Sequence, residues 1–329
     1  MAFLIWKSEP LKLWNTFLVS NPWLLLASFG ITIVLFLIKN IRWQSILVAQ
    51  DHKVTFKELW LLLFVGTYGS VITPAKVGDI LRAFYLTKRN EEVPMGHSVF
   101  SVVFDRLLDF VAIFLLTGIM APFILININV SWWIPVGIVG AFVLFLIMLL
   151  FFFNDKIGKP IIYFLVKIIS RVFSKKSAQD KITLTTEEIV GDFYSCQKNY
   201  RLYHYLWLSF LSLLYWVILG LQGSVLLLAF QATNIKIYVV ISVLCIAALT
   251  AFSIPISLSG IGVRDATTMS LLYLILGIEL DHALMLSIIQ TFFNMIIPGF
   301  VGGLLSIPLT RKFEEKQLAQ PSKEEKEEK

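Results

Sequence analysis

The sequence predicts an all-helical protein that crosses a membrane about seven or eight times. Of its 329 residues, 57% are hydrophobic and only 15% are charged, whereas a soluble domain has about 25% charged residues. Several apolar runs reach the roughly 20 residues that a helix needs to cross a hydrocarbon core about 30 Å thick. Strict alternation of apolar and polar residues is absent, so the spans are expected to be helices and not strands of a barrel.

The first half of the chain predicts an interfacial segment followed by four apolar stretches. Residues 1–21 mix large apolar side chains with charged ones, as a segment at a membrane surface does. The loop 39–58 is basic and includes Lys39 and Arg42. The expected apolar stretches are 23–38, 59–72, 98–126 and 132–153.

The second half predicts a long polar loop, further spans and a charged tail. The loop 154–204 is rich in Lys and Arg and contains amphipathic helical patterns. The expected apolar segments after it are 205–230, 238–254, 266–278 and 283–307. The chain is thus expected to form one membrane domain, 1–310, with a charged and disordered tail, 311–329.

The distribution of Lys and Arg predicts the orientation of the spans, because basic loops stay on the cytoplasmic side. The loop 154–204 is expected to be cytoplasmic. The basic segments on both sides of 59–72 favour the same side, so we expect a re-entrant hairpin over 59–90. Residues 238–278 are too few for two full spans, which leaves a second hairpin from outside or two short tilted helices. An inverted repeat is one interpretation of this arrangement.

Two stretches, 73–82 and 254–265, place helix-breaking residues next to charges inside otherwise apolar regions. A broken backbone in lipid leaves polar groups unpaired at several kcal/mol each, and a charge at mid-bilayer costs roughly 2.5–3.5 kcal/mol. Because both costs occur in each of the two stretches, we expect a functional site there. The candidate residues are Pro74, Gly78, Asp79 and Arg82 in the first stretch and Gly260, Gly262, Arg264 and Asp265 in the second.

A third charged group, Asp105-Arg106-Leu107-Leu108-Asp109, lies at the start of the span 98–126. On a helix, residues three or four apart share a face, so Arg106 is expected to pair with Asp109, and Asp79 with Arg82. These groups could close a shared polar cavity. The alternatives are that Arg82, Asp105 and Arg106 are charges at the membrane surface. Gly260 and Gly262 could likewise serve only helix packing, and the tryptophans, including Trp216, are expected to face lipid or the interface.

The candidate residues favour an anionic ligand. Arginine binds a phosphate through two parallel hydrogen bonds, and helix N-termini after the breaks would add partial positive charge. The surroundings are apolar, so a phospholipid or a polyprenyl-phosphate-linked lipid fits best, and no nucleic acid is expected. The sequence shows no metal-binding cluster, no cofactor motif and no catalytic motif, and the two cysteines, Cys196 and Cys245, are not expected to pair.

The order of these motifs resembles a known family over about 20–310. The motifs are Pro74…Gly78-Asp79…Arg82, Asp105-Arg106…Asp109, Pro255…Gly260-Ile261-Gly262…Asp265 and the late Gly299, Gly302 and Gly303. They are similar to the transmembrane region of lysylphosphatidylglycerol synthase, also called the flippase-like domain family. The resemblance implies a multi-pass cell-membrane domain that moves lipid between leaflets. Asp265 and Asp105 stand where that pattern has Glu, and Gln290 stands where it often has Arg, which leaves the lipid open.

Three functions remain in view from the sequence. A lipid translocase is the leading hypothesis, and an enzyme that acts on a lipid is the second. No aminoacyl-transferase segment follows the last span, so a non-enzyme is expected. The third is a scaffold that docks a cytoplasmic partner of lipid or glycan synthesis through 154–204. A homo-oligomer, proton coupling through Asp79, Asp109 or Asp265, and unassisted scrambling are left open.

Overall fold

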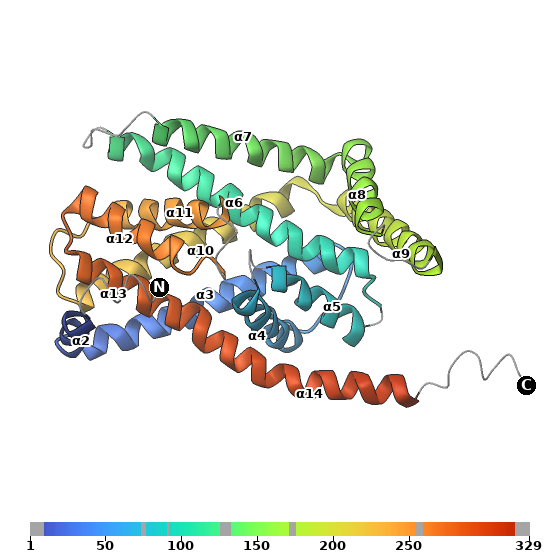
Figure 1. The fold of residues 1–329 in the computed structure, drawn as a ribbon, viewed down its shortest axis with the longest axis horizontal. Helices are drawn as coiled ribbons and strands as arrows, with labels where there is room; N and C mark the ends of the chain where they lie inside the picture. The colour runs from blue at the N-terminus through green and yellow to red at the C-terminus, as the bar shows by residue number, and fades with distance from the viewer. Residues whose placement is uncertain are drawn as a thin grey trace, which may run out of the picture.

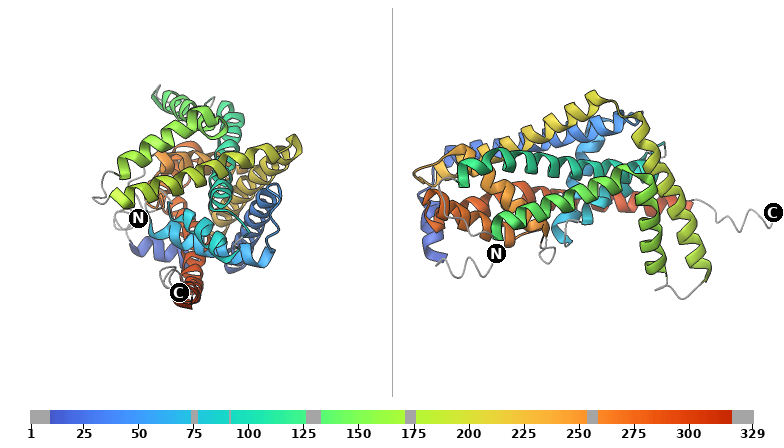
Figure 2. Two further views of the ribbon diagram at one scale, coloured as in Figure 1. Left: turned by 90° about the vertical axis from the view of Figure 1, so that its right-hand side faces the viewer. Right: turned by 90° about the horizontal axis from the view of Figure 1, so that it is seen from above.

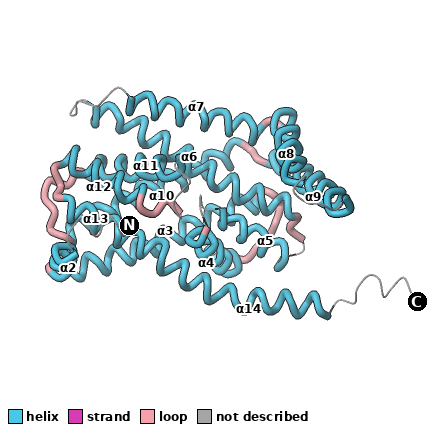
Figure 3. The backbone as a smooth tube through the Cα atoms, viewed as in Figure 1, coloured by secondary structure: helices cyan, strands magenta, loops and turns pink. Residues whose placement is uncertain are grey.

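The structure is a computed structural model of the 329-residue chain. It describes residues 10–73, 77–90, 92–125, 133–170, 176–253 and 259–319. Within these ranges all regular elements are helices, and Figure 3 shows only helices and the loops that join them. The long helices run along the longest axis of the molecule (Figure 1), as expected for a helical membrane protein.

Five long helical rods form the body of the protein. Three of them are candidate membrane spans by length and composition, Pro22–Val48, Leu202–Ala229 and Leu280–Leu309. The first has 27 residues, which at 1.5 Å per residue gives about 40 Å. The rods are α3 (Pro22–Val48), α6 (Met95–Leu125), α7 (Trp133–Phe153), α10 (Leu202–Ala229) and α13 (Leu280–Thr291), which continues through the π-helical turn η3 (Phe292–Ile296) into α14 (Ile297–Ala319).

Local sequence signals account for several helix ends. The Asn21 side chain accepts hydrogen bonds from the backbone N–H groups of Trp23 and Leu24 and so caps α3, which has Pro22 in its first turn. Thr55 caps α4 (Phe56–Ile72) in the same way through the Glu58 N–H. Gly277 adopts the left-handed conformation that ends α12 (Val263–Leu276), with φ of 66°.

Two helical hairpins lie in opposite halves of the molecule along its long axis (Figure 1). The first comprises α4, the short helix η1 (Val77–Asp79) and α5 (Ile80–Arg89), and its α4 and α5 lie from the centre to the right of Figure 1. The second comprises α11 (Ile237–Ser253) and α12, on the left of Figure 1. The longest of these helices has 17 residues, fewer than the about 20 of a full span. The side from which each hairpin enters the membrane stays a prediction.

Shorter helices lie across the long axis at its two ends. The predicted amphipathic loop forms α8 (Asp155–Ser170), α9 (Lys176–Ser195) and the turn η2 (Cys196–Asn199), and α8 and α9 stand across the bundle (Figure 2). At the other end, α2 (Pro10–Leu18) buries Leu13 and exposes Leu11, Trp14 and Leu18. At the C-terminus α14 is helical to Ala319, so residues 311–319 of the predicted disordered tail are helical and 320–329 lie outside the described residues.

Small residues allow close contact between α14 and the first hairpin. A Cβ atom at Gly302 would lie 1.9 Å from the Phe64 carbonyl oxygen of α4, and one at Gly299 would meet Val71. Within the hairpin, a Cβ at Gly78 would lie 2.0 Å from the backbone of Gly69. Helices in lipid gain stability mainly from such close packing, because lipid and apolar side chains are equally apolar.

We therefore expect Gly302→Ala to destabilise the protein by about 1–3 kcal/mol, the usual cost of overpacking. Gly30→Ala is the matched control, because nothing lies within 4 Å of its added Cβ and Ala is the better helix former. The thermal midpoint in detergent should fall for the first variant and hold or rise for the second. Equal midpoints for both would contradict the packing argument.

A histidine pair predicts the response of the fold to pH. The His52 Nε2 lies 2.8 Å from the His97 Nδ1, which joins the loop after α3 to α6. Burial, with the nearby His97, holds the pKa of His52 below its ordinary value, while Asp51 and Glu92 act in the opposite direction. The unfolded chain takes up this proton near pH 6.5 and the folded chain only at lower pH. Acidification from pH 7.5 to 5.5 should thus lower the thermal midpoint, and His52→Gln should reduce that pH dependence.

Candidate functional site

A buried network of ion pairs lies at the centre of the bundle. Arg42 of α3 is fully buried and donates from Nε to the Asp105 carboxylate and from Nη1 to the Asp109 carboxylate, each at 2.7 Å. The same Nη1 lies 2.8 Å from the Ser212 hydroxyl of α10. Because Asp105 and Asp109 are one turn apart on α6, a single guanidinium reaches both.

Two more arginines complete the network. Arg82 of α5 donates from Nη2 to the second oxygen of Asp105 at 2.7 Å and lies over the Trp43 ring at 4.8 Å. Arg106 binds the second oxygen of Asp109 at 3.2 Å and also pairs with Asp79. The Ser70 hydroxyl donates to Asp79, which ties α4 to the turn η1.

The six charges cancel, and this balance allows their burial. Moving a single ion into the interior costs several kcal/mol even after relaxation, and only well-placed partners offset the cost. Each carboxylate of the network accepts from at least one arginine. The pairs join α3, α6 and the first hairpin at one point.

A second charged group is built by the turn before α12. Asp265 is fully buried and accepts the Gly262 N–H at 2.8 Å and the hydroxyls of Ser287 and Thr291. Its neighbour Arg264 lies 3.5 Å from the same carboxylate and also bonds Thr291. Gly260 and Gly262 have φ of 80° and 95°, a left-handed region that favours glycine.

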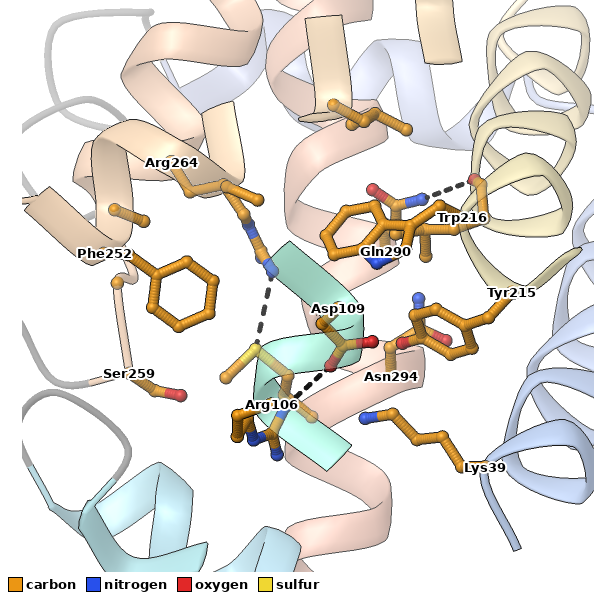
Figure 4. Close-up of a pocket in the computed structure, with 16 residues that line it drawn as sticks. Lys39, Arg106, Asp109, Tyr215, Trp216, Phe252, Ser259, Arg264, Gln290 and Asn294 are labelled. Atoms are coloured by element: carbon orange, nitrogen blue, oxygen red, sulfur yellow. Dashed lines mark hydrogen bonds and ion pairs between the residues drawn. The ribbon is translucent and has the colours of Figure 1, made fainter. Parts of the chain in front are cut away.

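A cavity of about 100 Å³ lies between the two charged groups. Figure 4 shows Arg264, Arg106 and Lys39 pointing into it from different helices, with Asp109 beside Arg106. Its walls come from α3, α6, α10, α11, α12 and the α13–η3 rod. The principal lining residues are Lys39, Arg106, Asp109, Tyr215, Trp216, Phe252, Ser259, Gly260, Arg264, Gln290, Asn294 and Met295.

Several donors in this wall are not satisfied by the described part of the chain. The Trp216 Nε1, the Ser259 hydroxyl and the Arg106 Nε are buried and have no hydrogen-bond partner among the described residues. A buried unpaired donor costs about 1–3 kcal/mol. Lys39 forms no ion pair in the described ranges and lies 5.1 Å above the Tyr215 ring. The wall therefore offers the positive charges of Lys39, Arg106 and Arg264 to a molecule with acceptor oxygens.

Amide side chains close the far side of the cavity. The Gln222 Oε1 of α10 accepts a hydrogen bond from the Asn294 amide N–H at 2.7 Å. The Gln222 amide N–H donates to the Thr32 hydroxyl at 2.8 Å. The Gln290 amide donates to the Leu219 carbonyl at 3.2 Å. These bonds fix the π-helical turn that carries Asn294 against α3 and α10.

The described residues among those predicted from the sequence occupy four kinds of position. Arg106, Asp109, Gly260, Arg264 and Gln290 line the cavity. Asp79, Arg82 and Asp105 belong to the ion network behind it, while Gly262 and Asp265 shape the turn before α12. Gly78 packs on Gly69, and Pro74 lies outside the described residues.

The expected pairings are met in part. Arg106 bonds Asp109 three residues later, as the helical spacing indicates. Asp79, however, pairs with Arg106 and not with Arg82, which binds Asp105. Arg82 and Arg264, the candidate arginines of the two broken stretches, do not both line the cavity, because Arg82 lies in the network behind it.

Sequence reasoning missed Arg42, Lys39, Asn294 and the cavity position of Trp216. Lys39 and Arg42 were expected in a basic loop after residue 38, but α3 continues to Val48 and buries Arg42. A signal was present, because neither Gly nor Pro occurs between residues 39 and 50 to end the helix. Trp216, expected to face lipid, is only 8% exposed.

Removal of Arg42 is expected to cost more stability than removal of any surface arginine. Arg42→Leu leaves two buried carboxylates without their shared partner, a change that costs about 3–5 kcal/mol. Arg89→Gln is the control, because Arg89 is 42% exposed and its pair with Glu58 at 3.0 Å is worth under about 1 kcal/mol. Unfolding in detergent measures both. Equal losses would show that the network contributes nothing beyond a surface pair.

Comparison with known proteins identifies relatives along nearly the whole chain. The family described as lysylphosphatidylglycerol synthase TM region matches residues 1–303. A UPF0104 membrane protein of Methanocaldococcus jannaschii is 25% identical over 318 residues, which cover 93% of this chain and 90% of that protein. One of Pyrococcus horikoshii is 21% identical and covers 82% of each chain. One of Methanothermobacter thermautotrophicus is 30% identical over 115 residues, 35% of this chain and 32% of that protein.

These relatives are membrane proteins by name, and the matched region coincides with the helices described above. The chain is a multi-pass helical membrane protein, and it belongs to the family of the lysylphosphatidylglycerol synthase TM region.

Proposed function

We propose that the cavity binds the headgroup of an anionic lipid and that the protein moves this lipid between the two leaflets of the membrane. The observation that carries the proposal is the cationic cavity inside an apolar bundle. Lys39, Arg106 and Arg264 face it, against one carboxylate of Asp109. The family description, which names a lipid synthase, agrees with a role in membrane-lipid handling.

The electrostatics of the cavity favour a phosphate group. Two unit charges 4 Å apart interact by about 4 kcal/mol at an effective dielectric constant of 20, against about 1 kcal/mol in water. Arg264 is 20% exposed and Arg106 is 22% exposed, so both guanidinium groups are open on one side. Phosphate oxygens accept hydrogen bonds from guanidinium groups in parallel pairs.

The size of the cavity favours a lipid headgroup over a whole lipid. A cavity of about 100 Å³ has room for a small polar headgroup and not for two acyl chains. The acyl chains of a bound lipid would therefore remain outside, among the exposed apolar side chains of the bundle. A site that encloses the headgroup and leaves the chains in the bilayer suits translocation.

Both broken hairpins contact this site. The second hairpin supplies Gly260 and Arg264 to the wall, and the first reaches it through Asp79, which pairs with the wall residue Arg106. Membrane transporters commonly place broken helices at a central binding site and open it alternately to each side. We propose that the two hairpins serve as the two gates.

Leaflet exchange tests the proposal directly. Liposomes that contain the purified protein and labelled phosphatidylglycerol should exchange the label between leaflets faster than protein-free liposomes. Arg264→Gln removes a charged hydrogen-bond donor worth about 1.5–3 kcal/mol, so exchange at low lipid concentration should fall roughly tenfold or more. Arg89→Gln, which alters an exposed arginine far from the cavity walls, should exchange at the wild-type rate.

The same assay separates the alternatives. Exchange without chemical change supports a translocase. A new lipid product, seen by mass spectrometry, would identify an enzyme instead. If wild-type protein produced neither exchange nor product, a scaffold for a cytoplasmic partner would be the better interpretation, and the translocase proposal would be overturned.

A further inference from the structure

We infer that the preferred headgroup carries one net negative charge, as a phosphodiester without an amine does. The inference rests on the proposed function, because it assigns the chemical class of the lipid that this same cavity takes. It comes from the balance of charged side chains in and around the cavity.

When the described charges of the ion network and of the cavity are added together, one positive charge is left without a counter-charge. The six groups of the ion network cancel, because three arginines face three aspartates. Around the cavity, Lys39 and Arg264 add two positive charges, and Asp265 supplies one negative charge. No other Asp, Glu, Lys or Arg lines the cavity among the described residues.

Lys39 is the residue that carries the excess. Arg264 lies 3.5 Å from the Asp265 carboxylate, whereas Lys39 contacts the Tyr215 ring and forms no ion pair in the described part of the chain. An aromatic face stabilises an ammonium group without neutralising it. The Lys39 ammonium therefore remains available for an anion that enters the cavity.

A single negative charge completes this balance. A phosphodiester brings one negative charge and two free oxygens, which can accept from the Lys39 ammonium and the Arg264 guanidinium that line the cavity. A phosphomonoester brings about −1.5 to −2 at pH 7, and the second charge would have no counter-ion. A phosphodiester headgroup that also carries an ammonium group has no net negative charge, so it cannot balance the positive charge of Lys39.

The experiment compares headgroups on identical acyl chains. Purified protein in zwitterionic-lipid nanodiscs binds a fluorescent phosphatidylglycerol, and unlabelled lipids compete for it at pH 8. We expect phosphatidylglycerol to compete at least tenfold better than phosphatidylcholine, lysyl-phosphatidylglycerol or doubly charged phosphatidic acid. Phosphatidic acid should improve as the pH falls towards 6, because its phosphate then carries a single charge.

Substitutions at Lys39 test the charge itself. Lys39→Gln removes the excess charge, so the tenfold preference for phosphatidylglycerol over phosphatidylcholine should disappear. Lys39→Arg, which keeps the charge, should restore it. If Lys39→Gln does not fold, Lys39→Met is the second variant, because it removes the same charge and keeps an unbranched side chain of similar length, and it should abolish the same preference.

The outcomes separate this inference from the proposed function. If phosphatidic acid at pH 8, phosphatidylcholine or the lysylated lipid competes best, while Arg264→Gln still abolishes binding, the charge inference is overturned and the lipid site stands. An unchanged preference in the variant that removes the excess charge overturns it as well. If wild-type protein binds no lipid in competition with these headgroups, or if Arg264→Gln leaves binding unchanged, the proposed function and the inference fall together.

Discussion

The ion pairs that Arg42 makes with Asp105 and Asp109 determine how the centre of the bundle is assembled. Two carboxylates one turn apart on α6 would repel each other and resist burial, and one guanidinium from α3 compensates both. Each carboxylate keeps a second oxygen, which Arg82 and Arg106 take. The first hairpin and the cavity wall are therefore both positioned by Arg42, a residue that does not itself line the cavity.

The two halves of the centre solve the problem of buried charge differently. The network pairs arginines with aspartates on separate helices and thus holds those helices together. The turn before α12 instead satisfies Asp265 with a backbone N–H and two hydroxyls, so Arg264 needs to give it only a long contact of 3.5 Å. Arg264 also lines the cavity beside this turn.

Much of the fold could be predicted because apolar composition and helix breakers are local signals. The spans 205–230 and 238–254 agree with α10 and α11 within a few residues. The partners of buried charges could not be predicted, because helical spacing describes one helix and these pairs join several. Arg42 resembled a surface charge because it follows Lys39 and Asn40 at the end of an apolar run, whereas its partners in space are Asp105 and Asp109. For the same reason Trp216 could not be told from a tryptophan that faces lipid.

The π-helical turn at Phe292–Ile296 connects two segments of one rod that make different contacts. Before it, Gln290 faces the cavity, and after it, Gly302 packs on α4. Successive residues of an α-helix are rotated by about 100°, as 3.6 residues per turn requires. Loss of one residue from the turn would rotate α14 by that angle relative to α13. Gln290 could then no longer face the cavity while Gly302 packs on α4. The length of this segment is therefore constrained even where its side chains are interchangeable.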